Sequence, residues 1–372
     1  SPDSIDFALY YPKAYDVLIN ELMPDPDPPV GLPDYEYAEL YNRSSYGINL
    51  KNWTLAIGAS VKTFPEIMIE PDSFLILTSS ASETFFTSFG PVIGFSSFSL
   101  INTGATMILS DSSGHIIHTV SYDVSWYQDS YKDNGGWSLE MIDNANPCGE
   151  VENWIASIDP SGGTPGKNNS VHFSNPDNTV PSLNSVSILS AGSIQLNFNE
   201  SLDSISLSNP LLYSIDNGIG NPVSVVLMKP DYKKVVLNLA LQLQQNILYS
   251  CTLTDTIHDC AGNSAVTTSS TFSIYEAKQF DVQINEIMAD PDPVVGLANY
   301  EYLELYNRSA YPISMKGWKL QIGATVNEIP DATLNTYGYL LLTSADGLTS
   351  VSTYGSAIAV DGFSISNGGE EL

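Results

Sequence analysis

The fold is decided by Val17-Leu18-Ile19-Asn20-Glu21-Leu22-Met23, a stretch that returns 265 positions downstream as Val282-Gln283-Ile284-Asn285-Glu286-Ile287-Met288. Residues 16–65 align with residues 281–330 without a gap, and 32 of these 50 positions are identical. From residue 66 to residue 107 the agreement falls to 11 of 42 positions, but the register is kept. Such a long-period repeat indicates a tandem array of modules.

The modules are predicted to be all-β. Short runs rich in Val, Ile, Tyr, Phe and Thr alternate with Gly, Pro, Asn and Ser, and there is no long helical stripe. The region 176–275 carries six or seven such runs in about 100 residues, a density typical of an immunoglobulin-like sandwich. We therefore expect tandem immunoglobulin-like β-sandwiches.

The repeat predicts the module boundaries. Residues 1–15 mirror the strand that precedes the second copy, so they are interpreted as the terminal strand of an upstream Ig-like domain. The first copy is expected over residues 16–172, with an exit linker at 160–169 that is rich in Gly, Pro, Ser and Asn. The middle module is expected over residues 173–279 and the second copy over residues 280–372.

The second copy is predicted to be truncated. Leu372 aligns with Met107, so residues 108–166 have no counterpart downstream of residue 372. A sandwich without its closing strands would expose an unpaired edge. We expect poor order beyond about Gly355, or an edge covered by another segment or chain.

The charge excludes two classes of partner. The chain has 13 Lys and Arg against 42 Asp and Glu, a formal net charge of -29. Such a surface repels phosphate backbones and anionic lipid headgroups, so neither nucleic acid nor a membrane surface is an expected partner. No apolar run approaches the roughly 18 residues of a membrane helix.

The cysteines are too few to form a disulfide framework. Cys148, Cys251 and Cys260 are an odd number. Cys251 ends a strand-like run and Cys260 follows a turn, so a hairpin could bring these two together as a disulfide. The alternative is that both are small buried thiols.

Three early and three late motifs resemble a lamin tail domain of the bacterial type. The early ones are Ile19-Asn20-Glu21-Leu22-Met23, Glu36-Tyr37-Ala38-Glu39-Leu40-Tyr41-Asn42 and Leu50-Lys51-Asn52-Trp53. The late ones are Gly136-Trp137-Ser138-Leu139-Glu140, Asn153-Trp154 and Thr164-Pro165-Gly166. One departure is Met141, where many members of the family carry a basic residue.

The middle module is similar to bacterial Ig-like domains of the surface-layer and adhesin type, through its turn Asp259-Cys260-Ala261-Gly262-Asn263. Alternation of the two families resembles secreted or surface proteins of Bacteroidetes-type bacteria. The resemblance implies a sandwich for the lamin tail modules, an extracytoplasmic location (secreted, periplasmic or cell surface) and no catalytic activity.

Acidic loops are the first candidate site. Asp25-Pro26-Asp27-Pro28 recurs as Asp290-Pro291-Asp292-Pro293, and Glu21 lies close by in the sequence. Proline keeps such a loop extended, and carboxylates are ligands that Ca²⁺ prefers. A calcium site using Glu21, Asp25, Asp27, Asp290 and Asp292 is therefore one hypothesis. The alternative is a solvated acidic loop.

Arginine and aromatic residues supply the other candidates. Arg43 and Arg308 are the only arginines, and each is expected to form a structural ion pair with a nearby glutamate, such as Glu36 or Glu39, rather than to bind an anion. Trp126 and Tyr127 are the preferred candidates for exposed ligand contact, because they precede a loop-like segment.

Enzyme chemistry has little support in the sequence. The four histidines are scattered, and His115 and His118 would face opposite sides of a strand. There is no Gly-x-Ser-x-Gly, phosphate-binding loop or Cys-x-x-Cys motif. We expect no cofactor, with Ca²⁺ as the one candidate.

The sequence favours a non-catalytic extracellular or cell-surface scaffold, spacer or adhesion segment, joined to neighbouring domains of a longer chain. One alternative is a module that binds glycan, protein or Ca²⁺ through the acidic Asp-Pro loops. The other is a set of accessory domains of a larger secreted enzyme.

Overall fold

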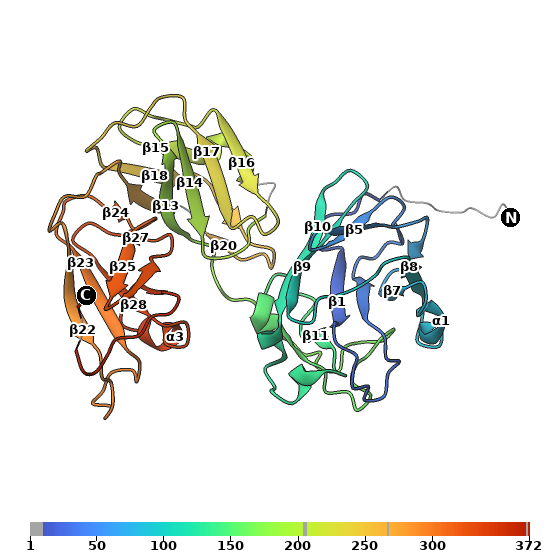
Figure 1. The fold of residues 1–372 in the computed structure, drawn as a ribbon. Coiled ribbons are helices and arrows are strands. Elements are labelled where there is room, and N and C mark those ends of the chain that lie inside the picture. Colours follow the sequence, from blue (N-terminus) through green and yellow to red (C-terminus); the bar gives the residue numbers. More distant parts are fainter. Residues whose placement is uncertain (1–9, 204–206, 266–267, 370) are drawn as a thin grey trace. The chain divides into compact units, whose positions relative to one another are not determined.

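The structure is a computed structural model that describes residues 10–203, 207–265, 268–369 and 371–372 (Figure 1). Most of the predicted terminal strand at residues 1–15 therefore lies outside the described residues. The chain forms two compact units, Ser1–Thr179 with Asp259–Asn263, and Val180–His258 with Ser264–Leu372.

The first unit is built around a six-stranded sheet. Its strand β1 is buried along all seven residues, and it pairs antiparallel with β11 on one side and β2 on the other. A β-bulge interrupts the β1–β2 register between Ile19 and Glu21. In sheet order the strands are β12 (Trp154–Ala156), β11 (Leu139–Met141), β1 (Val17–Met23), β2 (Tyr37–Asn42), β7 (Ser73–Ser79) and β8 (Val92–Phe95).

A second sheet completes this sandwich. Leu40 of the first sheet and Leu55 and Leu109 of the second share one core of buried residues, so the two sheets face each other. Its strands are β10 (Ile116–Asp123), β9 (Gly104–Ser110), β4 (Thr54–Ile57) and β5 (Ser60–Thr63), and a separate pair is β3 (Ile48–Asn49) with β6 (Met68–Ile69). The short helices are α1 (Glu83–Phe86), η1 (Val124–Tyr127), η2 (Lys132–Asn134) and η3 (Glu150–Asn153).

The other face of the six-stranded sheet is also covered. Met23, Tyr37 and Ile76 pack there against Phe86 of α1 in a smaller apolar cluster. Residues 157–171 lie over the rest of that face, and Gly163, Thr164 and Pro165 are buried. The prediction of an exit linker at 160–169 was wrong, because side chains of the sheet bind this segment.

The middle region forms the predicted immunoglobulin-like sandwich. In β14 every second residue is buried, and Leu196 shares a core with Leu237 of the neighbouring strand and Phe272 of the other sheet. One sheet is β13 (Leu183–Ser190), β14 (Ser193–Phe198), β17 (Lys234–Asn238) and β16 (Ser224–Met228). The second sheet is β15 (Tyr213–Ile215), β18 (Tyr249–Leu253) and β21 (Ser269–Phe272). A separate pair of strands is β19 (Ile257–His258) with β20 (Ser264–Ala265), and the short helix η4 (Pro210–Leu212) precedes β15.

The second copy repeats the register of the first. The bulge recurs between Ile284 and Glu286, and Glu286 opposes Glu304 as Glu21 opposes Glu39. Its main sheet is β22 (Val282–Met288), β23 (Tyr302–Asn307), β28 (Tyr339–Thr343) and β29 (Ala357–Ala359). The remaining elements are β24 (Ile313–Ser314) with β27 (Thr333–Leu334), β25 (Lys319–Ile322) with β26 (Thr325–Glu328), and α3 (Leu348–Val351).

Strand β22 has an unpaired edge that no described segment covers, and the expectation of poor order beyond about Gly355 was wrong, since Ala357–Ala359 there forms β29 and pairs with β28. Among the described residues β22 pairs with β23 alone, and Ile284 and Ile287 are 42% and 49% exposed. Their counterparts Ile19 and Leu22 are fully buried. In the first copy β10 packs against β1 and shares its core, whereas no strand among the described residues takes that place against β22.

The disulfide differs from the predicted one. Cys148 bonds Cys260, while Cys251 is a buried free thiol. Cys251 lies in β18 and faces the apolar core, whereas Cys260 lies in the Asp259–Asn263 turn, which groups with the first unit. The predicted Cys251–Cys260 pair was wrong because an inward-facing strand residue cannot reach that turn. No helix among the described residues is long and apolar enough to cross a membrane.

Candidate functional site

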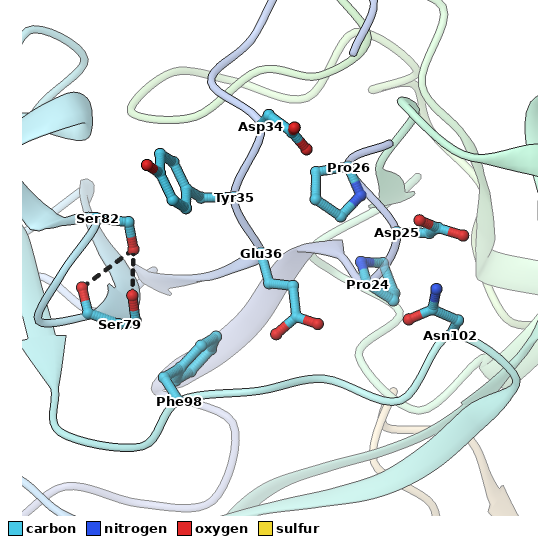
Figure 2. A pocket seen from close by; sticks show the side chains of 10 residues that line it. All are labelled: Pro24, Asp25, Pro26, Asp34, Tyr35, Glu36, Ser79, Ser82, Phe98 and Asn102. Atoms are coloured by element: carbon cyan, nitrogen blue, oxygen red, sulfur yellow. Dashed lines mark hydrogen bonds between the residues drawn. The ribbon is translucent and has the colours of Figure 1, made fainter. Parts of the chain in front are cut away.

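The first lamin-tail-like sandwich carries a polar pocket of about 260 Å³ (Figure 2). Its walls combine three carboxylates, two hydroxyls, one carboxamide, two aromatic rings and two prolines. The lining residues are Pro24, Asp25, Pro26, Asp34, Tyr35, Glu36, Ser79, Ser82, Phe98 and Asn102.

Ends of strands and the loops between them position this lining. Asp25 follows β1, Glu36 precedes β2, Ser79 ends β7, and Phe98 and Asn102 belong to the loop between β8 and β9. These segments begin or end at strands that are packed in the sandwich. The strands therefore fix the positions of the lining residues next to them.

Hydrogen bonds hold Glu36 in place at the back of the pocket. Its Oε2 accepts from the backbone N–H of Leu100 at 3.0 Å, and its backbone carbonyl accepts from the Thr78 hydroxyl at 2.8 Å. Burial raises the pKa of Glu36, the bonds from Leu100 and Ser99 lower it, and the nearby charge of Asp25 raises it. Glu36 is therefore a fixed acceptor.

No basic side chain lines the pocket, so its potential is negative. This charge excludes phosphates, sulfates and carboxylates as ligands. Tyr35 of the lining pairs with Phe85, which is not itself a lining residue, and the centroids of the two rings are 4.8 Å apart. Tyr35 is 36% exposed and Phe85 51%, so both rings are accessible to a ligand.

A row of three buried glutamates crosses the same sheet behind the pocket. Strand pairing places Glu140 of β11 opposite Glu21 of β1, and Glu21 opposite Glu39 of β2. All three are fully buried, and among the described residues no Lys or Arg forms an ion pair with them. Like charges in direct register repel one another, so the row needs other partners.

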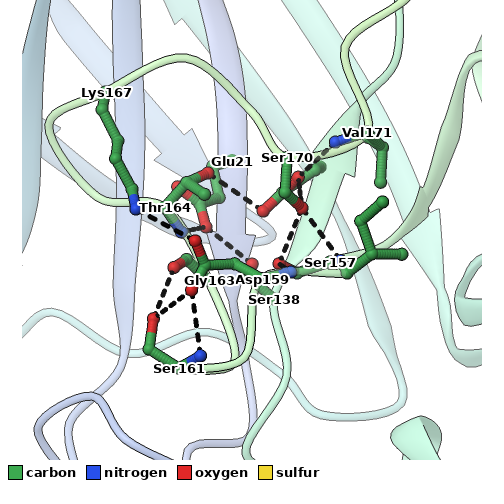
Figure 3. Close-up of polar contacts among 12 residues, drawn as sticks. Glu21, Ser138, Ser157, Asp159, Ser161, Gly163, Thr164, Lys167, Ser170 and Val171 are labelled. Carbon is green, nitrogen blue, oxygen red and sulfur yellow. Dashed lines mark hydrogen bonds and ion pairs between the residues drawn. The ribbon is translucent and has the colours of Figure 1, made fainter.

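Glu21 is held by donors from three segments, and Figure 3 shows two of the donor residues, Ser138 and Thr164. Its Oε1 accepts from the Tyr37 hydroxyl at 2.7 Å, the Ser138 hydroxyl at 2.6 Å and the Thr164 backbone N–H at 2.6 Å. Burial, with the charge of Glu140, raises the pKa of Glu21 to about 7, against the lowering effect of these bonds.

The other two glutamates bind the same returning segment. Glu140 accepts from the hydroxyls of Thr164 at 2.9 Å and Ser170 at 2.7 Å. Glu39 accepts from the Gly166 N–H at 2.5 Å, and burial raises its pKa well above the ordinary value. The row therefore anchors residues 157–171 to the sheet. Its carboxylates are enclosed and already hydrogen-bonded, which suits support rather than substrate chemistry.

The predicted calcium set is not brought together. Glu21 is enclosed in this network, Asp25 lines the pocket, and Asp27, Asp290 and Asp292 are exposed on their loops. In the described part of the chain, no group of three acidic side chains with oxygens within 4.8 Å of one another contains any of the five.

Trp126 and Tyr127 are not exposed. They lie in η1, only 6% and 3% of their surface is accessible, and Trp126 packs against Trp154 with ring centroids 6.0 Å apart. Their prediction as a ligand contact was wrong because a short 3₁₀ helix turns both rings into the core.

Among the described residues, neither arginine forms an ion pair with a glutamate. Arg43 donates from Nη1 to the backbone carbonyl of Asn144 at 2.6 Å, and its nearest electrostatic partner is Asp16. Arg308 is exposed and lies near Asp281. The predicted pairing with glutamate was wrong, because Glu36 is bound at the pocket and Glu39 is buried beside the returning segment.

His118 is a structural residue that the sequence did not single out. Its Nδ1 accepts from the Ile19 N–H at 2.9 Å, and its Nε2 lies 2.9 Å from the carbonyl of Pro147, to which it donates. Burial lowers the pKa of His118 to about 4, so the ring is neutral in the folded protein at pH 7. His115 is exposed and lies just before β10, beside Asp111, so the two histidines do not share a site.

The sheets, the separate cores and the enclosed carboxylates define the class: tandem immunoglobulin-like β-sandwiches. The family model of the lamin tail domain matches residues 12–123 and 276–372, and that of a bacterial Ig-like domain matches residues 174–274. The lamin tail matches cover more than half of the chain, which therefore belongs to the lamin tail domain family. Neither family is an enzyme family.

Comparisons with individual proteins add little. No curated protein matches the chain. One solved structure, the N-terminal part of the bacterial S-layer protein SbsC, matches at 18% identity and a TM-score of 0.24. The match covers 43% of this chain and 42% of that one, and supports no argument about this protein.

Proposed function

We propose that this chain is a non-catalytic, extracytoplasmic segment that acts as a scaffold or spacer in a surface or secreted protein. The observation that carries the proposal is the separation of the cores. Each sandwich has its own apolar cluster, so each can contribute a folded segment to an array.

Two further observations support an extracytoplasmic location. Disulfides such as Cys148–Cys260 persist mainly in oxidising compartments. The net charge of -29 keeps such an array soluble and away from anionic surfaces.

Localisation in the source cells tests the proposal. Antibodies raised against residues 12–372 should label intact cells or the culture supernatant, and external protease should remove the cell-bound signal. Labelling that requires permeabilised cells, with a cytosolic marker fractionating alongside, would contradict it. A panel of esterase, phosphatase, nuclease and glycosidase substrates should give no turnover with the purified chain.

A further inference from the structure

We propose that the pocket beside Tyr35 binds one sugar residue of a neutral saccharide. This binding activity goes beyond the scaffold role. The proposal rests on the polar groups of the pocket that form no hydrogen bonds within the protein.

Those groups are on the pocket wall. Among the described residues, the side chains of Asp25, Asp34 and Asn102 form no hydrogen bond with the rest of the protein. Figure 2 shows Glu36 between the aromatic side and the Asp25 and Asn102 side of the pocket. A ligand would therefore meet two free carboxylates and a carboxamide that both donates and accepts.

The polar and aromatic groups of the pocket indicate which class of ligand it can bind. Sugar hydroxyls can donate to Asp25 and Asp34 and accept from Asn102, while the C–H face of the ring packs on Tyr35. An organic cation would use the carboxylates but leave the amide donor without a partner. A metal ion needs carboxylates that converge, and no triplet of acidic side chains among the described residues does so here.

The volume of the pocket limits the size of the ligand. Pockets for drug-sized ligands run from about 300 to 1,000 Å³. At about 260 Å³ this one suits a single ring.

The second copy offers an internal comparison. It keeps Tyr300, Glu301 and Asn367 at the positions of Tyr35, Glu36 and Asn102, and Glu301 accepts from the Ile365 N–H at 2.9 Å as Glu36 does from Leu100. It replaces Asp34 by Asn299 and Phe85 by Ser350. Because it lacks one free carboxylate and the aromatic pair, we expect one binding site per chain, in the first copy.

The test begins with the full 372-residue chain, fluorescently labelled, on an array of neutral, amino and acidic glycans. Glycans retained by the chain, together with the methyl glycosides of mannose, galactose and N-acetylglucosamine, are then titrated by ligand-observed NMR. Neutral glycans should bind with a stoichiometry of one, and glucuronate should not bind.

Variants locate the site. Tyr35→Ala should weaken binding about tenfold or more through loss of the stacking face, and Asp34→Asn should weaken it severalfold through loss of an acceptor. The matched controls are Tyr131→Ala, which removes an exposed tyrosine, and Asp27→Asn, which removes a charge from the same loop outside the lining. Both should bind as the unmodified chain does, and thermal melts should show all four variants folded.

Three outcomes would overturn the proposal. The first is no retained neutral glycan at millimolar concentration. The second is binding that survives in folded Tyr35→Ala and Asp34→Asn. The third is Asp34-dependent binding of n-butylammonium or Ca²⁺ in place of saccharides.

Discussion

At the scale of single residues, the chain uses buried glutamates as anchors. Glu21, Glu39 and Glu140 lie side by side across three strands, and their donors are hydroxyls, backbone N–H groups and the Asn20 carboxamide rather than cations. Removal from water raises the pKa of Glu21 and of Glu39, so the folded state favours protons on these two carboxyls.

This predicts a pH dependence at Glu21. Its folded pKa of about 7 lies above the ordinary value of 4.5, so the folded state holds the proton more tightly than the unfolded state. The resulting stabilisation is complete below pH 4.5 and is lost as the pH rises through about 7. Urea unfolding between pH 4.5 and pH 8 should show this decline in the free energy of unfolding.

Glu21→Gln should flatten that decline, because a neutral amide can accept from Ser138 and Tyr37 without titrating. Glu152→Gln, at an exposed position, should leave the slope unchanged. A slope in the Glu21 variant equal to that of the unmodified chain would show that this carboxyl does not carry the dependence.

At the scale of elements, the returning segment 157–171 is the closing piece of the first sandwich. It has no regular strand, so its backbone groups depend on the sheet's side chains for partners. Asp159 stabilises its entry, since hydrogen bonds from Ser161, with Lys167, lower the pKa of Asp159 to about 2. The order of the segment also depends on contacts with residues far away in sequence, since Thr164 binds Glu21 and Gly166 binds Glu39.

Gly163 is a closely packed point of this closure, and its neighbours there are side chains of the glutamate network. A Cβ there would lie 2.5 Å from the Tyr37 hydroxyl, 2.7 Å from Glu21 Oε1 and 2.8 Å from the Ser138 hydroxyl. Gly163→Ala should therefore cost about 2–3 kcal/mol in free energy of unfolding, by overpacking the network. Faster limited proteolysis within 157–171 should accompany the loss.

Gly90→Ala is the control for that change, because its nearest contact would be an ordinary 3.5 Å. It should alter the free energy of unfolding by less than about 0.5 kcal/mol. Equal stability of the two variants would mean that the segment adjusts without strain.

At the scale of the whole molecule, the disulfide is a covalent link that the spacing of the cysteines in the sequence did not predict. Cys148 and Cys260 are 112 residues apart, with Cα atoms 6.2 Å apart, within the usual range for a disulfide. Closing so long a loop reduces the entropy of the unfolded chain by an amount worth about 4–5 kcal/mol in the chain-entropy estimate.

Peptide mapping without reduction should recover Cys148 joined to Cys260 and Cys251 as a thiol. Cys148→Ser, or reduction, should lower the unfolding temperature of the first unit. Cys251→Ser should leave the disulfide intact, because Cys251 lies in a separate core. Recovery of a Cys251–Cys260 peptide would contradict the structure.

The sequence by itself determined the modules, their register and their sandwich architecture. These follow from local signals: alternation sets which face of a strand is buried, and the repeat carries the same pattern into the second copy, including the bulge between Ile284 and Glu286. The Asp-Pro loop that the sequence indicated as a candidate site does line the pocket, although the predicted calcium ligands do not come together there.

Only the tertiary structure decided the partners of individual side chains. It placed Trp126 in the core, joined Cys148 to Cys260, and showed that the Thr164-Pro165-Gly166 stretch is held by glutamates rather than free as a linker. Each of these depends on which distant residues meet across the sandwich. A stretch rich in glycine and proline has the same sequence pattern whether it is a free linker or is bound by buried carboxylates. The role of residues 157–171 therefore depends on Glu21, Glu39 and Glu140, which only the folded chain brings opposite them.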